Sequence, residues 1–261
     1  MNIDPLNSRR NFVRKIALTG IAACSLPAFG TMAEDSFSSE KPKKTANLVF
    51  LFQGDSITDG NRGRTSDPNH IMGHGYAFSV ASRLGADYPE KNLTFYNRGI
   101  SGNKVTDLEA RWQKDTLDLK PDVLSILVGI NDSASVVFNR PLVVSPEYYE
   151  EVYRSLLDQT KAQFPDVLFV LCNPFNLPVG KVRDNWGAYH LDLERRQNIV
   201  KKLAEEYDTV FVDFQMVFDK ACKRAKPEYW MWDGVHPTVA GHELMAREWI
   251  KQVGKRLKFV R

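Results

Sequence analysis

Two residues of this chain could carry out chemistry together. They are Ser56, which follows an apolar run, and His236, which lies near the C-terminus. Ser56 lies in Gly54-Asp55-Ser56, shortly after the apolar run of residues 46–51. A serine hydroxyl becomes an effective nucleophile only beside a base. His236 follows Asp233 by three residues, and a carboxylate at this spacing can accept the Nδ1 proton and leave Nε2 to face Ser56. We therefore predict a catalytic triad of Ser56, His236 and Asp233; the alternative is a capping serine and a Trp-rich capping loop.

Acyl transfer also needs hydrogen-bond donors that face the oxyanion formed on the substrate. The sequence offers three candidates, which are the backbone N–H of Ser56, the backbone N–H of Gly99 and the side-chain amide of Asn131. A glycine suits this role because its backbone can approach a substrate closely. An amide suits it because it donates without carrying charge. We expect Asp55 to be a hydrogen-bonding residue of the turn rather than a second catalytic acid.

Other catalytic chemistries have less support. His70 and His74 lie in a Gly-rich segment without an obvious third metal ligand, and Ala246 stands where His242 would need a second histidine for a zinc motif. The G-x-S-x-G motif and a phosphate-binding loop are absent, and the S-x-x-K string at 101–104 lacks the partner motifs of penicillin-binding enzymes. We therefore expect no metal and no cofactor.

Short apolar runs alternate with helical patterns five times along the chain. This alternation predicts an α/β fold, with a five-stranded parallel sheet and helices on both faces. Ser56, Gly99 and Asn131 each come just after a strand, and the carboxyl ends of parallel strands share one edge. The predicted strands span 46–51, 93–96, 122–128, 167–172 and 209–212. The predicted helices span 76–88, 105–119, 191–207, 216–224 and 238–257, with another beginning at 146, and we expect an irregular loop over about 173–188.

The N-terminus reads as an export signal. Residues 8–15 carry the Arg9-Arg10 pair and resemble a twin-arginine motif, and the apolar stretch that follows, 16–29, is too short to span a bilayer. Residues 31–33 look like a signal peptidase site, while residues 21–25 look like a lipoprotein box with Cys24 as the lipidated residue. We predict a signal peptide over 1–33, a linker over 34–45 and a catalytic domain over 46–258. The expected location is periplasmic, extracellular or lipid-anchored; the alternative is a cytosolic protein with a basic tail.

The composition is that of an ordinary globular protein. The chain has 261 residues, 43% of them hydrophobic, and its net charge of +3 comes entirely from residues 1–33. The remainder is neutral, so no basic excess indicates a nucleic-acid partner. Contact with a membrane is expected only through the signal or a lipid anchor. A homo-oligomer and a bridge between Cys172 and Cys222 are both left open.

These motifs together resemble the SGNH/GDSL hydrolases. Four blocks match in order, namely 54–56, 97–99, 129–132 and 233–236, and the similarity covers essentially the whole of 46–257. The resemblance implies a flavodoxin-like three-layer α/β/α sandwich and a metal-free serine esterase. It also implies Ser56 as nucleophile, His236 as base and Asp233 as the residue that orients it, with Ser56, Gly99 and Asn131 as the oxyanion hole.

Segments 108–112, 129–132 and 232–237 look most like the acetylxylan-esterase branch of that family. This likeness implies removal of O-acetyl groups from plant-type oligosaccharides. Four aromatic residues in predicted loops could stack on sugar rings, although ordinary packing would also explain them; they are Trp186, Tyr189, Trp230 and Trp232. The alternatives are a lysophospholipase or thioesterase of the same family, or a carbohydrate-binding protein that has lost catalysis.

Overall fold

Five short parallel strands form the central sheet of the protein. The structure is a computed structural model that describes residues 44–65 and 67–260. The strand order is β2-β1-β3-β4-β5, which is the flavodoxin-like order. The strands are β1 (Val49–Gly54), β2 (Thr94–Asn97), β3 (Val123–Leu127), β4 (Leu168–Cys172) and β5 (Val210–Val212). The predicted α/β fold with a five-stranded parallel sheet is thus confirmed. The predicted signal peptide and most of the predicted linker lie outside the described residues.

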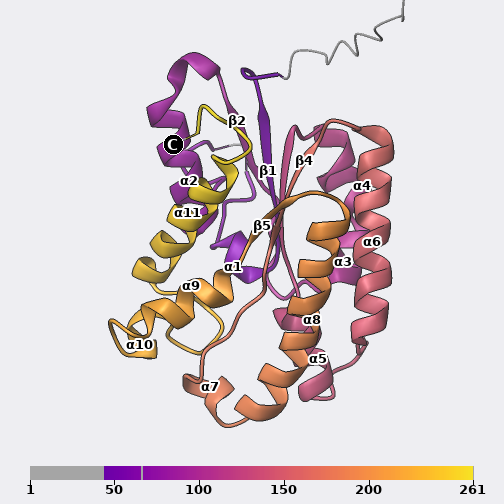
Figure 1. The fold of residues 1–261 in the computed structure, drawn as a ribbon, viewed down its shortest axis with the longest axis vertical. Helices are drawn as coiled ribbons and strands as arrows, with labels where there is room; N and C mark the ends of the chain where they lie inside the picture. Colours follow the sequence, from indigo (N-terminus) through magenta and orange to yellow (C-terminus); the bar gives the residue numbers. More distant parts are fainter. Residues whose placement is uncertain (1–43, 66, 261) are drawn as a thin grey trace, which may run out of the picture. The chain divides into compact units, whose positions relative to one another are not determined.

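Helices cover both faces of the sheet (Figure 1). One face carries α2 (Tyr76–Asp87), α9 (Phe214–Ala221) and α11 (Val239–Val253). The other carries α3 (Val105–Ala110), α4 (Trp112–Asp115), α6 (Pro146–Gln163) and α8 (Trp186–Glu206). The remaining helices are α1 (Ser56–Asp59), α5 (Ile130–Val137), α7 (Gly180–Arg183) and α10 (Pro227–Trp230), with 3-10 turns η1 (Pro89–Lys91) and η2 (Leu117–Leu119).

The sheet is buried on both faces, which explains the continuous apolar runs in the sequence. In β1, Phe50 and Phe52 pack into the core beneath α2 and α11, while Leu51 between them packs into the core beneath α6. Side chains alternate between the two faces of a strand, so a run without polar residues supplies both cores at once.

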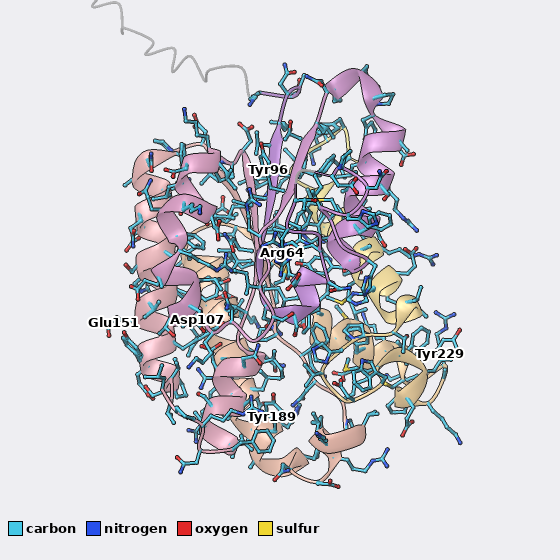
Figure 2. All side chains as sticks on the ribbon, turned by 180° about the vertical axis from the view of Figure 1, so that it is seen from behind. Arg64, Tyr96, Asp107, Glu151, Tyr189 and Tyr229 are labelled. Atoms are coloured by element: carbon cyan, nitrogen blue, oxygen red, sulfur yellow. The ribbon has the colours of Figure 1, made fainter. Side chains whose placement is uncertain are left out.

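Some predicted boundaries shift, since the strand expected over 46–51 spans Val49–Gly54 and the helix expected over 216–224 spans Phe214–Ala221. Two other predicted elements differ more. The helix expected over 105–119 is broken at Arg111, because the backbone leaves the helical region there and the buried Trp112 donates its indole N–H to Thr160 Oγ1 at 3.0 Å. The loop expected to reach Ala188 ends earlier, because α8 already begins at Trp186. Tyr189 is buried in this first part of α8 and donates its hydroxyl to the Ile130 carbonyl at 2.9 Å (Figure 2).

Candidate active site

The serine at the end of β1 occupies the first position of α1. Asp55 caps this helix, since its Oδ1 accepts the N–H of Ile57 at 3.0 Å. Gly54 has no room for a side chain: an added Cβ would lie 2.4 Å from both the Leu127 carbonyl and Thr58 Oγ1. The turn is therefore tight enough to place Ser56 at the carboxyl edge of the sheet with its side chain only half-buried.

The structure brings Ser56 together with His236 and Asp233, although 180 positions separate the serine from the histidine in the sequence. Ser56 Oγ lies 2.8 Å from His236 Nε2. On the other side of the ring, His236 Nδ1 lies 2.7 Å from Asp233 Oδ2. This arrangement gives the hydroxyl a base and gives the base a carboxylate that orients it, which is the geometry of a nucleophilic triad.

The loop that carries Asp233 and His236 is rigidly held. Asp233 Oδ1 accepts two backbone N–H groups of its own loop, from Val235 at 2.9 Å and from His236 at 2.7 Å. Gly234 has φ +92°, and a Cβ there would lie 2.5 Å from the Val179 carbonyl. The Leu177 N–H also donates to the Gly234 carbonyl at 3.0 Å. The segment after β4 therefore supports the histidine loop, a role that the sequence analysis did not assign to it.

The charges of the site favour a basic imidazole. The hydrogen bond to Asp233 raises the pKa of His236 above its ordinary value, and burial opposes this shift only in part. Burial by itself would raise the pKa of Asp233, but the hydrogen bonds from His236 and Val235 outweigh it and lower that pKa. Asp233 is therefore ionised throughout the pH range in which His236 gains and loses its proton.

Two further carboxyl groups beside the site are fully buried. Burial raises the pKa of Asp55 to about 7 and the pKa of Asp132 to about 6. Each uses one oxygen to fix a backbone N–H, since Asp132 Oδ1 accepts that of Val105 at 3.0 Å. Asp55 therefore holds the turn that carries Ser56, and Asp132 ties the helix that carries Asn131 to the start of α3. For Asp55, this is the structural role expected from the sequence.

The predicted oxyanion donors Gly99 and Asn131 differ in burial and in hydrogen-bond partners. Gly99 is buried, and its N–H donates to Asn97 Oδ1 at 2.9 Å. A Cβ on Gly99 would lie 2.3 Å from the Asp59 nitrogen, so this glycine is required for packing. Asn131 is half-buried and donates Nδ2 to the Asn103 carbonyl at 3.2 Å, at the end of the turn that begins at Gly99.

Gly102 lies in this same turn and differs from Gly99 in each respect. It is exposed, has φ +84° and has open space where a Cβ would be. Among the described residues, no backbone hydrogen bond uses its N–H. Gly102 was not among the donors predicted from the sequence, where the only signal for it is that it is the second glycine of Gly99-Ile100-Ser101-Gly102.

The predicted sugar-stacking residues divide into two groups. Trp232 has 67% of its surface exposed, and its ring lies 6.0 Å from that of His236 at 23°. Trp230 and Tyr189 are buried in the core, so the prediction for these two is wrong. Trp186 is half-buried and stacks on His190 with ring centroids 4.4 Å apart. Trp186 and Tyr189 thus pack as part of α8, and Trp230 packs as part of α10.

The structure also shows the state of the two cysteines and the place of His242. Cys172 and Cys222 are both free thiols, so no bridge joins them. His242 is half-buried and caps α2, where its Nδ1 accepts the Tyr76 N–H at 3.1 Å; the loss of solvent around the ring lowers its pKa to about 4. Within 44–65 and 67–260, no group of three or more His, Cys, Asp or Glu is arranged to hold a metal. None of the helices in that part of the chain is both long and apolar enough to cross a membrane.

The side chains of Ser56, His236 and Asp233 thus have the arrangement of a nucleophilic triad at the edge of a parallel sheet. Comparison with known proteins gives the family to which the chain belongs. Residues 52–244 match the GDSL-like Lipase/Acylhydrolase family. An acetylxylan esterase of Geobacillus stearothermophilus is 37% identical over 216 residues, which are 78% of this chain and 93% of that protein. Its crystal structure superimposes with a TM-score of 0.71, covering 81% of this chain and 96% of that one.

The crystal structure of a GDSL-like protein from Parabacteroides merdae has a TM-score of 0.77 at 40% identity, covering 82% of this chain and 99% of that one. The chain belongs to the GDSL-like lipase/acylhydrolase family and is a carboxylic ester hydrolase. The membership predicted from the four sequence blocks is thereby confirmed.

Proposed function

We propose that this protein removes O-acetyl groups from carbohydrates, with acetylated xylo-oligosaccharides or similar plant glycans as substrates, through an acyl-enzyme intermediate. The observation that carries the proposal is the continuous hydrogen-bonded path from Ser56 through His236 to Asp233. The similarity to an acetylxylan esterase over most of both chains supports the substrate class. In that esterase, catalytic mutants carry alanine at a serine, at an aspartate and at a histidine three positions after the aspartate. Asp233 and His236 have the same separation.

In the proposed reaction, Ser56 Oγ attacks the acetyl carbonyl while His236 Nε2 takes its proton. The tetrahedral intermediate collapses as His236 returns this proton to the leaving sugar oxygen, which releases the sugar alcohol. Water then attacks the acetyl-serine with His236 again as base, and acetate leaves as Ser56 is restored. Asp233 holds the ring and stabilises the imidazolium formed in each half-reaction.

The oxyanion hole in this proposal consists of the Ser56 N–H, the Gly102 N–H and the Asn131 amide. The first N–H groups of a helix have no partner within it, which suits the Ser56 N–H. Gly102 replaces Gly99 as the glycine donor because the Gly99 N–H is buried against Asn97 Oδ1, whereas Gly102 is exposed. Asn131 contacts the carbonyl of Asn103, the residue that follows Gly102, so the two donors belong to one neighbourhood.

Replacement of Asn131 by alanine is expected to lower kcat for p-nitrophenyl acetate about 10²–10³-fold, or about 2.7–4 kcal/mol of transition-state stabilisation, with little change in KM. The amide donates to charge that develops only in the transition state, so substrate binding is spared. Steady-state kinetics measure both constants. Asn198→Ala, which removes an exposed amide of α8, is the matched control. An Asn131→Ala enzyme with unchanged kcat would remove Asn131 from the oxyanion hole.

Trp232→Ala is expected to raise KM for acetylated xylo-oligosaccharides about fivefold, because an aromatic contact is worth about 1 kcal/mol. The exposed ring beside His236 could stack on a sugar, whereas p-nitrophenyl acetate has no sugar and should keep its kcat/KM. The control is Tyr229→Ala, which removes an aromatic ring 60% exposed on α10 (Figure 2). Equal effects of Trp232→Ala on both substrates would argue against a sugar platform.

The substrate class is tested by comparing p-nitrophenyl acetate, p-nitrophenyl octanoate and acetylated xylan. We expect the acetyl esters to be preferred. A strong preference for octanoate would favour the lysophospholipase or thioesterase alternative. Binding of xylo-oligosaccharides without turnover of any ester would favour the inactive carbohydrate-binding alternative.

We also propose that the protein is exported, supported by the arginine pair and apolar stretch of residues 9–29. Expression of the full chain with Arg9→Lys and Arg10→Lys, followed by cell fractionation, tests this. Retention in the cytoplasm only in the double variant is the expected result. The same fractionation with Cys24→Ala separates a lipid-anchored form from a cleaved soluble one.

A further inference from the structure

We propose that Asp59, paired with Arg64, is a positioning residue that holds the Gly102 N–H in place beside Ser56. The proposal rests on the esterase mechanism and oxyanion hole proposed above. Asp59 is the last residue of α1, three positions after the nucleophile, and is only 2% exposed. It therefore cannot contact the substrate directly and acts through its neighbours.

The Asp59 carboxylate joins two segments that are far apart in the sequence. Arg64 approaches it with both terminal nitrogens, at 3.0 Å to Oδ1 and 2.7 Å to Oδ2 (Arg64 is labelled in Figure 2). The Arg62 N–H donates to Oδ1 at 3.1 Å. Ser101 donates both its N–H and its hydroxyl to Oδ2, each at 3.0 Å. One buried carboxylate thus ties the helix of the nucleophile to the turn at Ser101.

Ser101 directly precedes Gly102, so this anchor acts next to the proposed oxyanion donor. Ser101 and Gly102 are both exposed, and the turn closes on itself through the Asn103 N–H and the Ile100 carbonyl at 3.1 Å. That bond shapes the turn but does not attach it to α1. Asp59 supplies the attachment at Ser101, and the direction of the following N–H depends on it.

The anchor depends on the negative charge of Asp59. All five groups that contact the carboxylate are donors. Burial by itself would raise the pKa of Asp59, but the hydrogen bonds from Arg64 and Ser101 lower it, so the carboxylate is ionised at neutral pH. An asparagine has the same shape, but either orientation of its amide turns an NH₂ group towards donors. Asp59→Asn should therefore release the turn without changing any atom of the triad.

Three variants should weaken the contacts of Asp59 to increasing degrees. Ser101→Ala removes one of the two bonds from Ser101, Arg64→Gln removes the cation that pairs with Asp59, and Asp59→Asn weakens every bond to the carboxylate. Complete loss of one oxyanion donor costs about 10²–10³-fold in kcat. We expect about 3-fold, 10-fold and 100-fold losses of kcat, in that order, with KM for p-nitrophenyl acetate within about threefold. Arg154→Gln, which breaks the ion pairs of Arg154 with Glu150 and Glu206 on the α6 side, is the control.

The deciding measurement compares p-nitrophenyl acetate with its thionoacetate analogue, in which sulfur replaces the carbonyl oxygen. Sulfur accepts hydrogen bonds weakly, so the thiono ester gains less from an oxyanion hole. A displaced Gly102 N–H should therefore reduce turnover of the oxygen ester more than that of the thiono ester. The ratio of the two rates should fall in step with kcat across the three variants and stay constant in Arg154→Gln.

Equal losses on both esters would overturn the proposal, because they would place the damage in the triad or in general folding. Unchanged kcat in Asp59→Asn would also overturn it. Circular dichroism and thermal melting check folding; if Asp59→Asn does not fold, the ester ratio in Ser101→Ala and Arg64→Gln still decides. Wild-type protein that hydrolyses neither ester would instead contradict the proposed function.

Discussion

Replacement of Ser56 by alanine is expected to lower kcat/KM for p-nitrophenyl acetate by about 10⁵–10⁶-fold, close to abolition. The hydroxyl 2.8 Å from His236 Nε2 is the only group that the proposed mechanism uses to form the acyl-enzyme. Alanine leaves the turn intact, because Asp55 caps α1 through its own carboxylate and not through the serine. Steady-state hydrolysis measures the loss, and mass spectrometry of the wild-type protein after reaction should find one acetyl group on Ser56.

The controls for this variant separate chemistry from folding. Ser82→Ala removes an exposed hydroxyl on α2 and should leave kcat/KM unchanged. The thermal midpoint of Ser56→Ala should remain within a few degrees of wild type, since no backbone group depends on the Ser56 hydroxyl in the described structure. Appreciable turnover by well-folded Ser56→Ala protein would contradict the acyl-enzyme mechanism.

The constellation around this serine could be predicted because each part carries a local signal. Apolar runs of strand length predicted the sheet, and a parallel sheet brings its carboxyl ends to one edge whatever the separation along the chain. The carboxylate of Asp233 can reach the imidazole of His236 because both lie in one turn, and the structure gives 2.7 Å between Asp233 Oδ2 and Nδ1. Neither inference required knowledge of long-range packing.

The glycine donor and the aromatic residues could not be predicted in this way. Gly99 and Gly102 are three residues apart in one turn, and only tertiary contacts distinguish them. Asn97 Oδ1 accepts the N–H of Gly99, while that of Gly102 stays free of backbone partners in the described residues. Likewise Trp230 and Trp232 are two positions apart, yet one is 6% exposed and the other 67%. The short α10 ends between them, and propensity does not locate the end of a four-residue helix.

The role of Asp59 was also hidden in the sequence. An aspartate at the end of a Ser-Ile-Thr-Asp string is typical of any helix or turn boundary. Its five hydrogen bonds come from residues up to 42 positions away. A buried carboxylate that receives only donors is a feature of the folded state, and the sequence gives no sign of which partners will gather around it.

Asp233→Asn is expected to lower kcat for p-nitrophenyl acetate about 10⁴-fold, or about 5.5 kcal/mol. The two backbone N–H groups that bind Oδ1 should hold the carbonyl oxygen of the asparagine in the same position. The NH₂ group then faces His236 Nδ1, which must become an acceptor. The ring proton then sits on Nε2, and a protonated Nε2 cannot accept the proton of Ser56. Asp233→Ala should be equally inactive, because it removes the orientation of the ring.

The pH dependence gives a second readout of the same contact. His236 must be neutral to act as base, so wild-type kcat/KM should rise with pH, with a midpoint above the ordinary histidine value of 6.5. Without the Asp233 carboxylate, burial lowers the pKa of His236 and only Asp55 opposes this, so the residual activity of Asp233→Asn should have its acidic limb at lower pH. A limb that does not move would show that another group controls it.

The same contact makes a signed prediction for stability. Because the folded-state pKa of His236 is raised, the pair stabilises the fold fully below the ordinary histidine pKa, and this contribution is lost as the pH rises through the raised value. Asp233→Asn should therefore destabilise the protein more at pH 5.5 than at pH 9, provided that Asp233 is ionised at both, as its lowered pKa indicates. Urea unfolding at the two pH values measures this difference. Equal destabilisation would mean that the contact contributes only geometry, and the loss of activity would then be due to the tautomer alone.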